Sequence, residues 1–453
     1  MKLLTVEKAA EVTGGRYVGP ETGKCARIES VVRDNREVTP GALFVCIRGE
    51  RVDGHDFAPA AWESGAVCCL CEHEPKGEGP FILVPSATAA LRRLAAYYRS
   101  LFTIPVIGVI GSVGKTTAKE MAAAVLSARF NTYKTPKNLN NDIGVPLSLL
   151  QMGEEHEMAV IEMGISDFGE MTVLAEMVRP TACIFTNIGY CHLEQLGDTR
   201  GVLRAKSEVF PYMPRNGLAV VNGDDELLRE LEPGIPKCTF GFGEQNDFIA
   251  RDVENRGEDG VDLTIAYAGG SFRAHIPGYG SHLPLAALPA AALGKRFGLS
   301  DEEITAGLGA YTTVEGRSRI IDTGYIRIID DCYNANPNSV TAAILSLTKM
   351  EGRKVAILGD MKELGRQSRE LHRGIGALAG EKLDCLICCG GEAENIYKGL
   401  IAGGSETEAW QFPLKDALLS VLPSLIRKGD NVLVKASHSM HFEELTEELK
   451  KLR

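Results

Sequence analysis

The sequence predicts an α/β protein in three successive parts, residues 1–100, 101–314 and 315–453. A chain of 453 residues is too long for a single hydrophobic core. Strand-like and helical segments alternate through the second and third parts, which is typical of parallel sheets covered by helices. The content of 44% hydrophobic and 24% charged residues is that of an ordinary globular protein.

The first part mixes short strands with two helical segments. It also contains a loop rich in glycine and charge, from Arg48 to His55. Near its end, apolar residues recur at helical spacing from Thr88 to Leu101. This spacing predicts a helix that leads into the second part.

The second part has short apolar runs separated by helical ones, which predicts a mostly parallel sheet covered by helices. The expected strands are Ile104–Ile110, Met158–Met163, Thr181–Ile188 and Leu218–Asn222. A polar, glycine-rich stretch from Glu244 to Gly280 is expected to form a small antiparallel addition. Two helices should follow it, Leu285–Phe297 and Asp301–Tyr311.

The third part repeats the alternation and predicts a second doubly wound sheet. Its expected strands are Tyr325–Asp331, Lys354–Leu358, Leu383–Cys389 and Asn431–Ala436. Its expected helices are Ser339–Met350, Ser368–Glu381 and Leu414–Arg427. Serine is a favoured N-cap residue, so Ser339 is predicted to cap the first of them.

The bulk properties argue against several classes of protein. A net charge of -11 does not suit a mainly electrostatic nucleic-acid binder. No apolar run approaches the roughly 20 residues of a membrane-spanning helix. The N-terminus becomes charged before a signal-like region could form, so a cytoplasmic protein is expected. The 12 cysteines offer no paired C-x-x-C motifs, which favours reduced core thiols.

The strongest motif is G-S-V-G-K-T-T, from Gly111 to Thr117, between a predicted strand and a helix. Glycine lets the backbone approach phosphates, so that N–H groups and the helix N-terminus surround the anion. Lys115 would reach the β- and γ-phosphates, and the Thr116 hydroxyl would ligate magnesium. The motif is shorter than the usual phosphate loop, because Val109 stands at the first glycine position. We therefore predict an ATP-binding domain.

Other candidate residues each have an ordinary structural interpretation as well. Glu162 ends a predicted strand and could bind magnesium, cap a helix or form a salt bridge. His192 follows the next strand and could be a metal ligand or a hydrogen-bonded structural histidine. Lys206 would by default be a solvated helix lysine, and the Asn-rich segment Lys137–Asp142 a turn and helix cap.

Taken together, these segments resemble the Mur ligase family, ATP-dependent enzymes that form amide bonds in cell-wall synthesis. The resemblance covers essentially the whole chain. It implies three domains: an N-terminal UDP-substrate α/β domain, a central P-loop parallel-sheet ATPase, and a C-terminal Rossmann-like domain that brings in the amino component.

The resemblance also implies site residues. Catalytic roles fall on Lys115, Lys206, His192 and Arg317. The ATP site would comprise Gly111, Ser112, Val113, Gly114, Lys115, Thr116, Thr117, Asn138, Asn141, Arg317, Asp331, Tyr333, Asn334 and Asn336. Two magnesium ions would be held by Thr116, Glu162, His192 and a Lys206 carbamylated by carbon dioxide. Carbamylation turns a cation into a carboxylate that can ligate the second ion.

In the first domain, the segments around Asp34 and Gly49 resemble the family's uridine-substrate segment. The implied substrate-binding residues are Asn35, Arg36, Arg48, Gly49, Arg51, Asp53, Gly54 and His55. Elsewhere the chain departs from family motifs. Leu283 and Ala286 stand at the asparagine positions of an H-N-x-x-N string, and His438 stands for an arginine.

Three segments resemble the D-alanyl-D-alanine-adding branch of the family: Lys137–Pro146, Tyr333–Pro337 and Leu358–Gly365. They imply a ligase that joins D-Ala-D-Ala to UDP-MurNAc-tripeptide through an acyl phosphate, and that acts as a monomer. One alternative is a sister ligase adding lysine or diaminopimelate, although no D-N-P-R-like motif is present. Another is a P-loop NTPase switch. A dehydrogenase does not fit, because neither alternating region has G-x-G-x-x-G after a strand.

Overall fold

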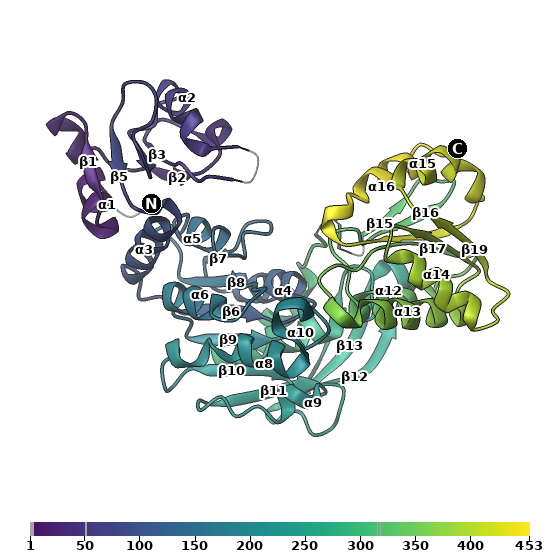
Figure 1. The fold of residues 1–453 in the computed structure, drawn as a ribbon. Helices are drawn as coiled ribbons and strands as arrows, with labels where there is room; N and C mark the ends of the chain where they lie inside the picture. Colours follow the sequence, from purple (N-terminus) through teal and green to yellow (C-terminus); the bar gives the residue numbers. More distant parts are fainter. Residues whose placement is uncertain (1–3, 50–51, 315, 318) are drawn as a thin grey trace.

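The computed structural model describes residues 4–49, 52–314, 316–317 and 319–453. Three sheets follow one another along the chain, and each carries its own helices (Figure 1). The three-part α/β architecture predicted from the sequence is therefore confirmed, while the boundaries at residues 100 and 314 stay predictions.

The N-terminal sheet has five strands in the order β1-β5-β4-β3-β2, with only β1 antiparallel to its neighbour. The strands are β1 Arg16–Val18, β2 Ser30–Val32, β3 Ala42–Val45, β4 Cys68–Cys71 and β5 Phe81–Leu83. Helices α1 (Val6–Thr13) and α2 (Ala58–Glu63) accompany the sheet. Every residue of β3 and β4 is buried, which explains their unbroken apolar sequences.

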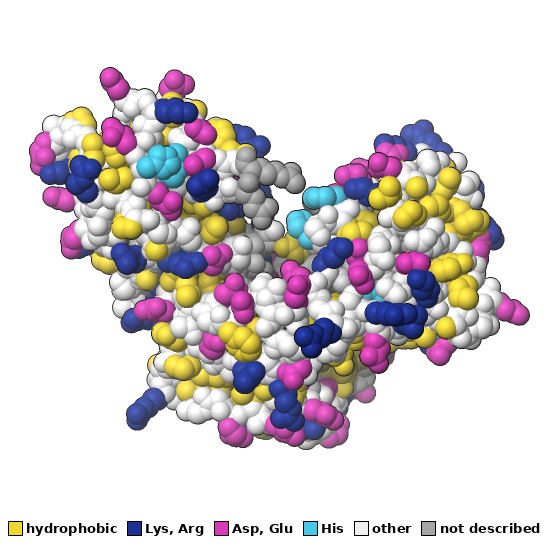
Figure 2. Space-filling view, in the orientation of Figure 1, with side chains coloured by type: hydrophobic (Ala, Val, Ile, Leu, Met, Phe, Trp, Pro, Cys, Tyr) yellow, Lys and Arg dark blue, Asp and Glu magenta, His cyan; other side chains and the backbone are white. Residues whose placement is uncertain are grey.

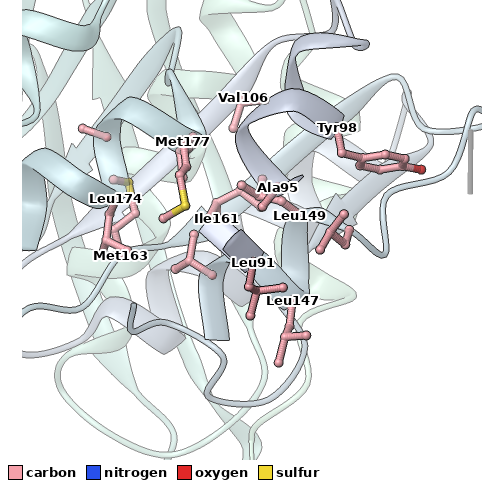
Figure 3. Close-up of a cluster of buried hydrophobic side chains, with 14 of the residues drawn as sticks. Leu91, Ala95, Tyr98, Val106, Leu147, Leu149, Ile161, Met163, Leu174 and Met177 are labelled. Atoms are coloured by element: carbon pink, nitrogen blue, oxygen red, sulfur yellow. The ribbon is translucent and has the colours of Figure 1, made fainter. Parts of the chain in front are cut away.

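Helix α3 (Ala87–Ser100) joins the first part to the central one, as its helical spacing predicted. Figure 3 shows its Leu91 and Ala95 packed among side chains of the central domain. The Tyr98 hydroxyl donates to the Met152 carbonyl at 2.6 Å, and Nε of Arg99 donates to the Val178 carbonyl at 2.9 Å. This shared core and these two bonds attach α3 to the central domain.

The central sheet has nine strands in the order β14-β13-β12-β11-β10-β9-β6-β8-β7. They are β6 Val106–Ile110, β7 Thr132–Lys134, β8 Met158–Glu162, β9 Ala182–Phe185, β10 Leu218–Asn222, β11 Lys237–Gly241, β12 Phe248–Asn255, β13 Val261–Tyr267 and β14 Gly270–Ile276. Strands β6 to β12 pair in parallel with one another. The polar stretch after Glu244 forms antiparallel strands as predicted, but they extend the central sheet.

Helices cover both faces of this sheet. One core includes α4 (Lys115–Ser127), α10 (Leu283–Arg296) and α11 (Asp301–Gly309). The opposite core includes α3, α5 (Gly144–Leu149), α6 (Glu170–Val178) and α8 (Thr199–Ser207). The carboxyl ends of β6, β8 and β9 meet at one edge, where residues from several loops can converge on one ligand.

The C-terminal sheet has the order β15-β16-β20-β17-β18-β19 and is parallel except at β15. Its strands are β15 Arg319–Asp322, β16 Arg327–Asp330, β17 Lys354–Gly359, β18 Cys385–Cys389, β19 Glu408–Phe412 and β20 Asn431–Lys435. One face carries α12 (Pro337–Leu347), α13 (Ser368–Lys382) and α14 (Ala393–Ala402). The other carries α15 (Lys415–Leu425) and α16 (Glu443–Leu449). The predicted doubly wound sheet is confirmed.

The predicted N-cap of α12 is wrong. Asn336, not Ser339, caps the helix, and its side chain accepts the Ser339 N–H at 2.8 Å. The Ser339 hydroxyl lies 3.0 Å from the Asn336 nitrogen and completes a capping box. Pro337 occupies the first helical position, where its fixed φ favours a helix start. The helix therefore begins two residues earlier than Ser339.

All 12 cysteines are free in the structure, and ten of them are buried, which fits their predicted place in the core. No helix of the described chain is long and apolar enough to cross a membrane.

Buried His372 on α13 makes the stability of the C-terminal domain sensitive to pH. Its Nε2 accepts the Met361 N–H at 3.0 Å, and its Nδ1 lies 2.7 Å from the Ser368 carbonyl oxygen. Burial lowers the pKa of His372 from its ordinary 6.5. The neutral ring therefore stabilises the fold above pH 6.5, and this contribution is lost as the pH falls below 6.5.

We expect His372→Gln to lower the free energy of unfolding at neutral pH by about 1–3 kcal/mol, because buried hydrogen bonds are lost. When the pH is lowered from about 7 to about 5.5, the variant should also lose less unfolding free energy than the wild type, as measured by urea unfolding. His73→Gln, at an exposed histidine, is the control and should keep the wild-type profile. An unaltered pH profile in His372→Gln would contradict this role.

Candidate active site

The phosphate-loop motif lies where β6 ends and α4 begins. Gly111 has φ +152°, and a Cβ there would lie 1.9 Å from Oγ1 of Thr186. Gly114 has φ +78° and precedes α4 without a side-chain cap, so the first helical N–H groups stay free. Free N–H groups at a helix N-terminus are a ready binding site for phosphate.

Residues after β9 hold this loop in place. Backbone N–H groups of Ser112 and Val113 donate to the Asn187 carbonyl and to its side-chain oxygen, at 3.0 and 2.9 Å. The Thr186 hydroxyl donates to the Val113 carbonyl at 2.6 Å. Lys115 extends back over the loop, with Nζ 3.0 Å from the Gly111 carbonyl oxygen. Burial lowers the pKa of Lys115. An incoming anion would therefore meet a poorly hydrated cation.

Glu162 is the buried carboxylate of the site, at the end of β8 and 1% exposed. Its Oε1 accepts hydrogen bonds from the Thr116 hydroxyl at 3.3 Å and from Nδ2 of Asn140 at 2.8 Å. Its Oε2 is buried without a hydrogen bond and lies 3.9 Å from Nζ of Lys119. A buried carboxylate oxygen without a donor is costly, and oxygen is the ligand that Mg²⁺ prefers. The arrangement is suited to hold that ion.

His192 lines the same cavity as Glu162, and Lys206 lies close enough to Lys115 for the two charges to interact. His192 caps α7 (Leu193–Leu196) and lines the cavity described below. Its Nδ1 is 2.5 Å from Oε2 of Glu363, although the two groups are not aligned as a hydrogen bond. This histidine lowers the pKa of Glu363.

Lys206 on α8 is a buried lysine, 1% exposed, and not the solvated residue that its sequence context allowed. Burial lowers the pKa of its amine to about 8, and the charge of Lys115 acts in the same direction. Among the described residues, no hydrogen bond or ion pair reaches its Nζ.

The C-terminal domain supplies the opposite side of the site. The Arg317 guanidinium stacks on the Tyr333 ring, 3.9 Å from its centre, and donates to the Thr116 hydroxyl at 3.4 Å. Asp331 is buried and lies 2.5 Å from Nζ of Lys435, which also donates to the Asn334 carbonyl at 2.9 Å. The segment Asp331–Asn334 is thereby fixed against the end of β20.

A cavity of about 410 Å³ lies between the central and C-terminal domains. Its size is in the range of small-molecule sites. The predicted residues that line it are Ser112, Val113, Gly114, Lys115, Thr116, Thr117, Asn141, Glu162, His192, Arg317, Asp331, Tyr333, Asn334 and Asn336. Gly111, Asn138 and Lys206 lie outside this lining, and Asn138 is exposed.

Several lining residues were not among the predicted ones. Asn140 donates to Glu162, and Lys435 pairs with Asp331. Asn338 accepts the Tyr190 N–H at 3.1 Å and so joins the two domains. Asn140 lay within a segment already singled out, but the others depend on tertiary contacts that no motif displays. Of the positions that depart from family motifs, Ala286 lines the cavity and Leu283 is buried in the core.

The predicted substrate residues of the N-terminal domain lie away from this cavity. The Asp34 carboxylate binds the Arg36 guanidinium at 2.6 Å, next to Asn35. In the second segment, Arg48 forms a β-bridge with Asp53, and the Gly49 N–H donates to the Val52 carbonyl at 2.9 Å. Arg51 lies outside the described residues.

The second segment is held by Gly54 and His55. A Cβ at Gly54 would lie 2.7 Å from the backbone of Ile47. Nδ1 of His55 contacts Asp53 at 2.6 Å, and its Nε2 accepts the Glu72 N–H at 2.8 Å. Both ring nitrogens are therefore engaged, so the nearby Asp53, His55 and His73 do not offer a free metal site. Figure 2 shows a hollow between the N-terminal and C-terminal domains, above the central one.

Three family patterns match the chain. The Mur ligase middle domain matches residues 109–294, and the Mur ligase glutamate ligase domain matches residues 316–438. The Mur ligase family catalytic domain matches residues 27–124.

Two enzymes named UDP-N-acetylmuramoyl-tripeptide–D-alanyl-D-alanine ligase match the chain over nearly its whole length. The Bacillus subtilis (strain 168) enzyme is 35% identical over 452 residues, covering 98% of each chain. The Escherichia coli (strain K12) enzyme is 36% identical over 454 residues, again 98% of each chain.

Solved structures agree with these matches. MurF from Acinetobacter baumannii superposes with a TM-score of 0.90 at 31% identity, covering 100% of this chain and 99% of that one. MurF ligase from Thermotoga maritima in complex with ADP gives a TM-score of 0.82 at 30% identity, covering 94% and 97%. Family patterns, relatives and structures all agree with the geometry of the site. The chain belongs to the Mur ligase family.

Proposed function

We propose that this protein is the ATP-dependent ligase that joins D-alanyl-D-alanine to UDP-MurNAc-tripeptide, forming UDP-MurNAc-pentapeptide, ADP and phosphate. The main observation that supports this proposal is full-length similarity, at 35% and 36% identity, to two enzymes named for this reaction. The cavity between phosphate loop and C-terminal domain supports the use of ATP, as does the ADP bound by the Thermotoga maritima relative.

ATP would bind with its phosphates on the free N–H groups of the loop and with Lys115 at the β- and γ-phosphates. Arg317 would neutralise phosphate charge from the C-terminal side, since it already reaches Thr116. Asp331, fixed by Lys435, would accept hydrogen bonds from the ribose. We also keep the other residues that were predicted to bind ATP as part of the proposed ATP site.

The residues present fit a magnesium ion on the nucleotide side, and we propose a second ion on the substrate side. Thr116 and the free Oε2 of Glu162 would hold the nucleotide-side ion, and His192 with Lys206 would hold the substrate-side ion. When bound, such ions neutralise charge on the transferred phosphoryl group and on the attacking carboxylate.

We further propose that Lys206 is carbamylated. Because burial lowers the pKa of this amine to about 8, far more of it is in the neutral form that reacts with carbon dioxide than in an ordinary lysine. A bare ammonium next to Lys115 would repel a cation, whereas a carbamate would ligate one and balance that lysine.

The reaction then proceeds in two steps. A carboxylate oxygen of the tripeptide attacks the γ-phosphorus of ATP, the bond from phosphorus to the ADP oxygen breaks, and an acyl phosphate forms. The D-Ala-D-Ala amine attacks the acyl carbon, phosphate leaves and the nitrogen loses a proton. This chain's residues mainly position two anions and neutralise their charge. These two effects should supply most of the rate enhancement.

The N-terminal domain would bind the UDP-linked substrate through the two segments around Arg36 and Arg48. The amine would arrive with the C-terminal domain, so the substrates meet only when the domains are close together. Since the reaction consumes ATP, we propose that the protein acts in the cytoplasm, and we keep the expectation of a monomer.

An assay in which the amine acceptor is exchanged distinguishes this function from a sister ligase and from an NTPase switch. ATP turnover with UDP-MurNAc-tripeptide should require D-Ala-D-Ala, while lysine or diaminopimelate with the dipeptide precursor should give none. A sister ligase would show the reverse pattern. An NTPase switch would hydrolyse ATP at the same rate with no acceptor.

A further inference from the structure

A segment of the C-terminal domain, Gly359–Gly365, reaches across to α7 of the central domain. The Glu194 N–H donates to the Glu363 carbonyl at 3.3 Å. A Cβ at Gly365 would lie 3.1 Å from Cα of Glu194, so the two backbones approach closely. The segment is anchored on its own domain by the buried side chains of Met361 and Leu364. It therefore links the two domains next to the phosphate-loop cavity.

The two residues that meet across this contact both have left-handed backbones. His192 has φ +52° and Glu363 has φ +64°. Histidine visits this region more readily than most residues, but glutamate seldom does. Half of the Glu363 side chain is exposed, and an exposed ion pair contributes little to stability. Backbone strain that stability does not explain points to a functional constraint.

The contact is made to one specific edge of the His192 ring. Nδ1 is buried and lies 2.5 Å from Oε2 of Glu363, while 24% of the side chain remains exposed. The exposed part of the side chain therefore excludes Nδ1, and His192 lines the cavity. Metal-binding histidines usually hold a carboxylate or carbonyl on the second nitrogen, which sets the tautomer and the ring orientation.

We propose that Glu363 is a positioning residue, delivered by the C-terminal domain, which orients His192 so that Nε2 faces the substrate-side ion. The inference rests on the proposed function. Because His192 and Glu363 belong to different domains, the ion site is complete only when these domains are docked. Formation of the acyl phosphate is thereby tied to the arrival of the domain that carries the amine.

The test uses the full-length protein with Glu363→Ala and Glu363→Gln. Glu194→Gln is the matched control, because Glu194 is an exposed acidic residue in the same contact, where its backbone N–H donates to the Glu363 carbonyl. Binding of Mn²⁺ in the presence of ADP, followed by electron paramagnetic resonance, reports the ion site without turnover. We expect Glu363→Ala to weaken Mn²⁺ affinity about 10–100-fold. Glu363→Gln should lose less, and the control should match the wild type.

Kinetics add a second readout. We expect Glu363→Ala to lower kcat about 10–100-fold with little change in the KM for ATP. The loss should vanish in a His192→Ala background, because Glu363 acts through that ring. Wild-type Mn²⁺ affinity in Glu363→Ala, or an equal loss with and without His192, would overturn the proposal. If wild-type protein ligated no D-Ala-D-Ala, the proposed function would fail while Mn²⁺ binding still decided the role of Glu363.

Discussion

Lys115→Ala is expected to lower kcat for ligation by about 10²–10³-fold or more, since it removes a preorganised cation from the developing phosphoryl charge. Lys115 is the residue that crosses the phosphate loop, with Nζ 3.0 Å from the Gly111 carbonyl oxygen. Burial lowers its pKa, so little hydration must be stripped when phosphate arrives. The rate of ADP formation at saturating substrates measures the effect.

The control for this prediction is Lys134→Ala. Lys134 lies on β7 and pairs with Glu120 on the surface, with 49% of its side chain exposed. The Lys134→Ala substitution should leave kcat unchanged. Lys115→Ala should still bind ADP, because the loop N–H groups remain. Ligation within a few-fold of wild type in Lys115→Ala would show that the phosphates bind elsewhere.

Lys206→Ala is expected to reduce kcat about 10²-fold or more, because the substrate-side ion would lose its carbamate ligand. Wild-type activity should fall in buffer depleted of carbon dioxide and recover with bicarbonate. The variant should not respond to bicarbonate at all. The measurement is the rate of phosphate release in paired assays with and without added bicarbonate.

Lys398→Ala is the matched control, since Lys398 on α14 is half exposed and pairs with Glu394. It should show both wild-type activity and a wild-type bicarbonate response. Full activity of Lys206→Ala under both conditions would disprove carbamylation as part of the mechanism, and Lys206 would then be a structural buried lysine.

Much of the architecture could be predicted because its signals are local. Each doubly wound sheet has buried strands that appear as short apolar runs, such as Leu218–Asn222, which the structure reproduces at both ends. The turn between β6 and α4 could be predicted because glycines and a lysine are needed at fixed positions there. Edge strand β19 was not predicted, because none of its residues is buried and its sequence shows no apolar run.

The site could be predicted only in part, for a physical reason. Residues such as Lys115 and Glu162 follow a strand end and belong to motifs, so sequence alone points to them. Lys435 and Glu363 reach the site from distant segments, and their partners are set by how the sheets pack. The cap of α12 was mispredicted because Asn336 and Ser339 both favour caps, and only Pro337 decides where the helix starts.

The most direct test of the account is a single coupled assay of phosphate release and product mass. Protein, ATP and magnesium are incubated with UDP-MurNAc-tripeptide, with and without D-Ala-D-Ala. The account predicts sustained phosphate release only when both acceptors are present, together with UDP-MurNAc-pentapeptide in equal amount. Phosphate release that ignores both acceptors, with no pentapeptide formed, would contradict it.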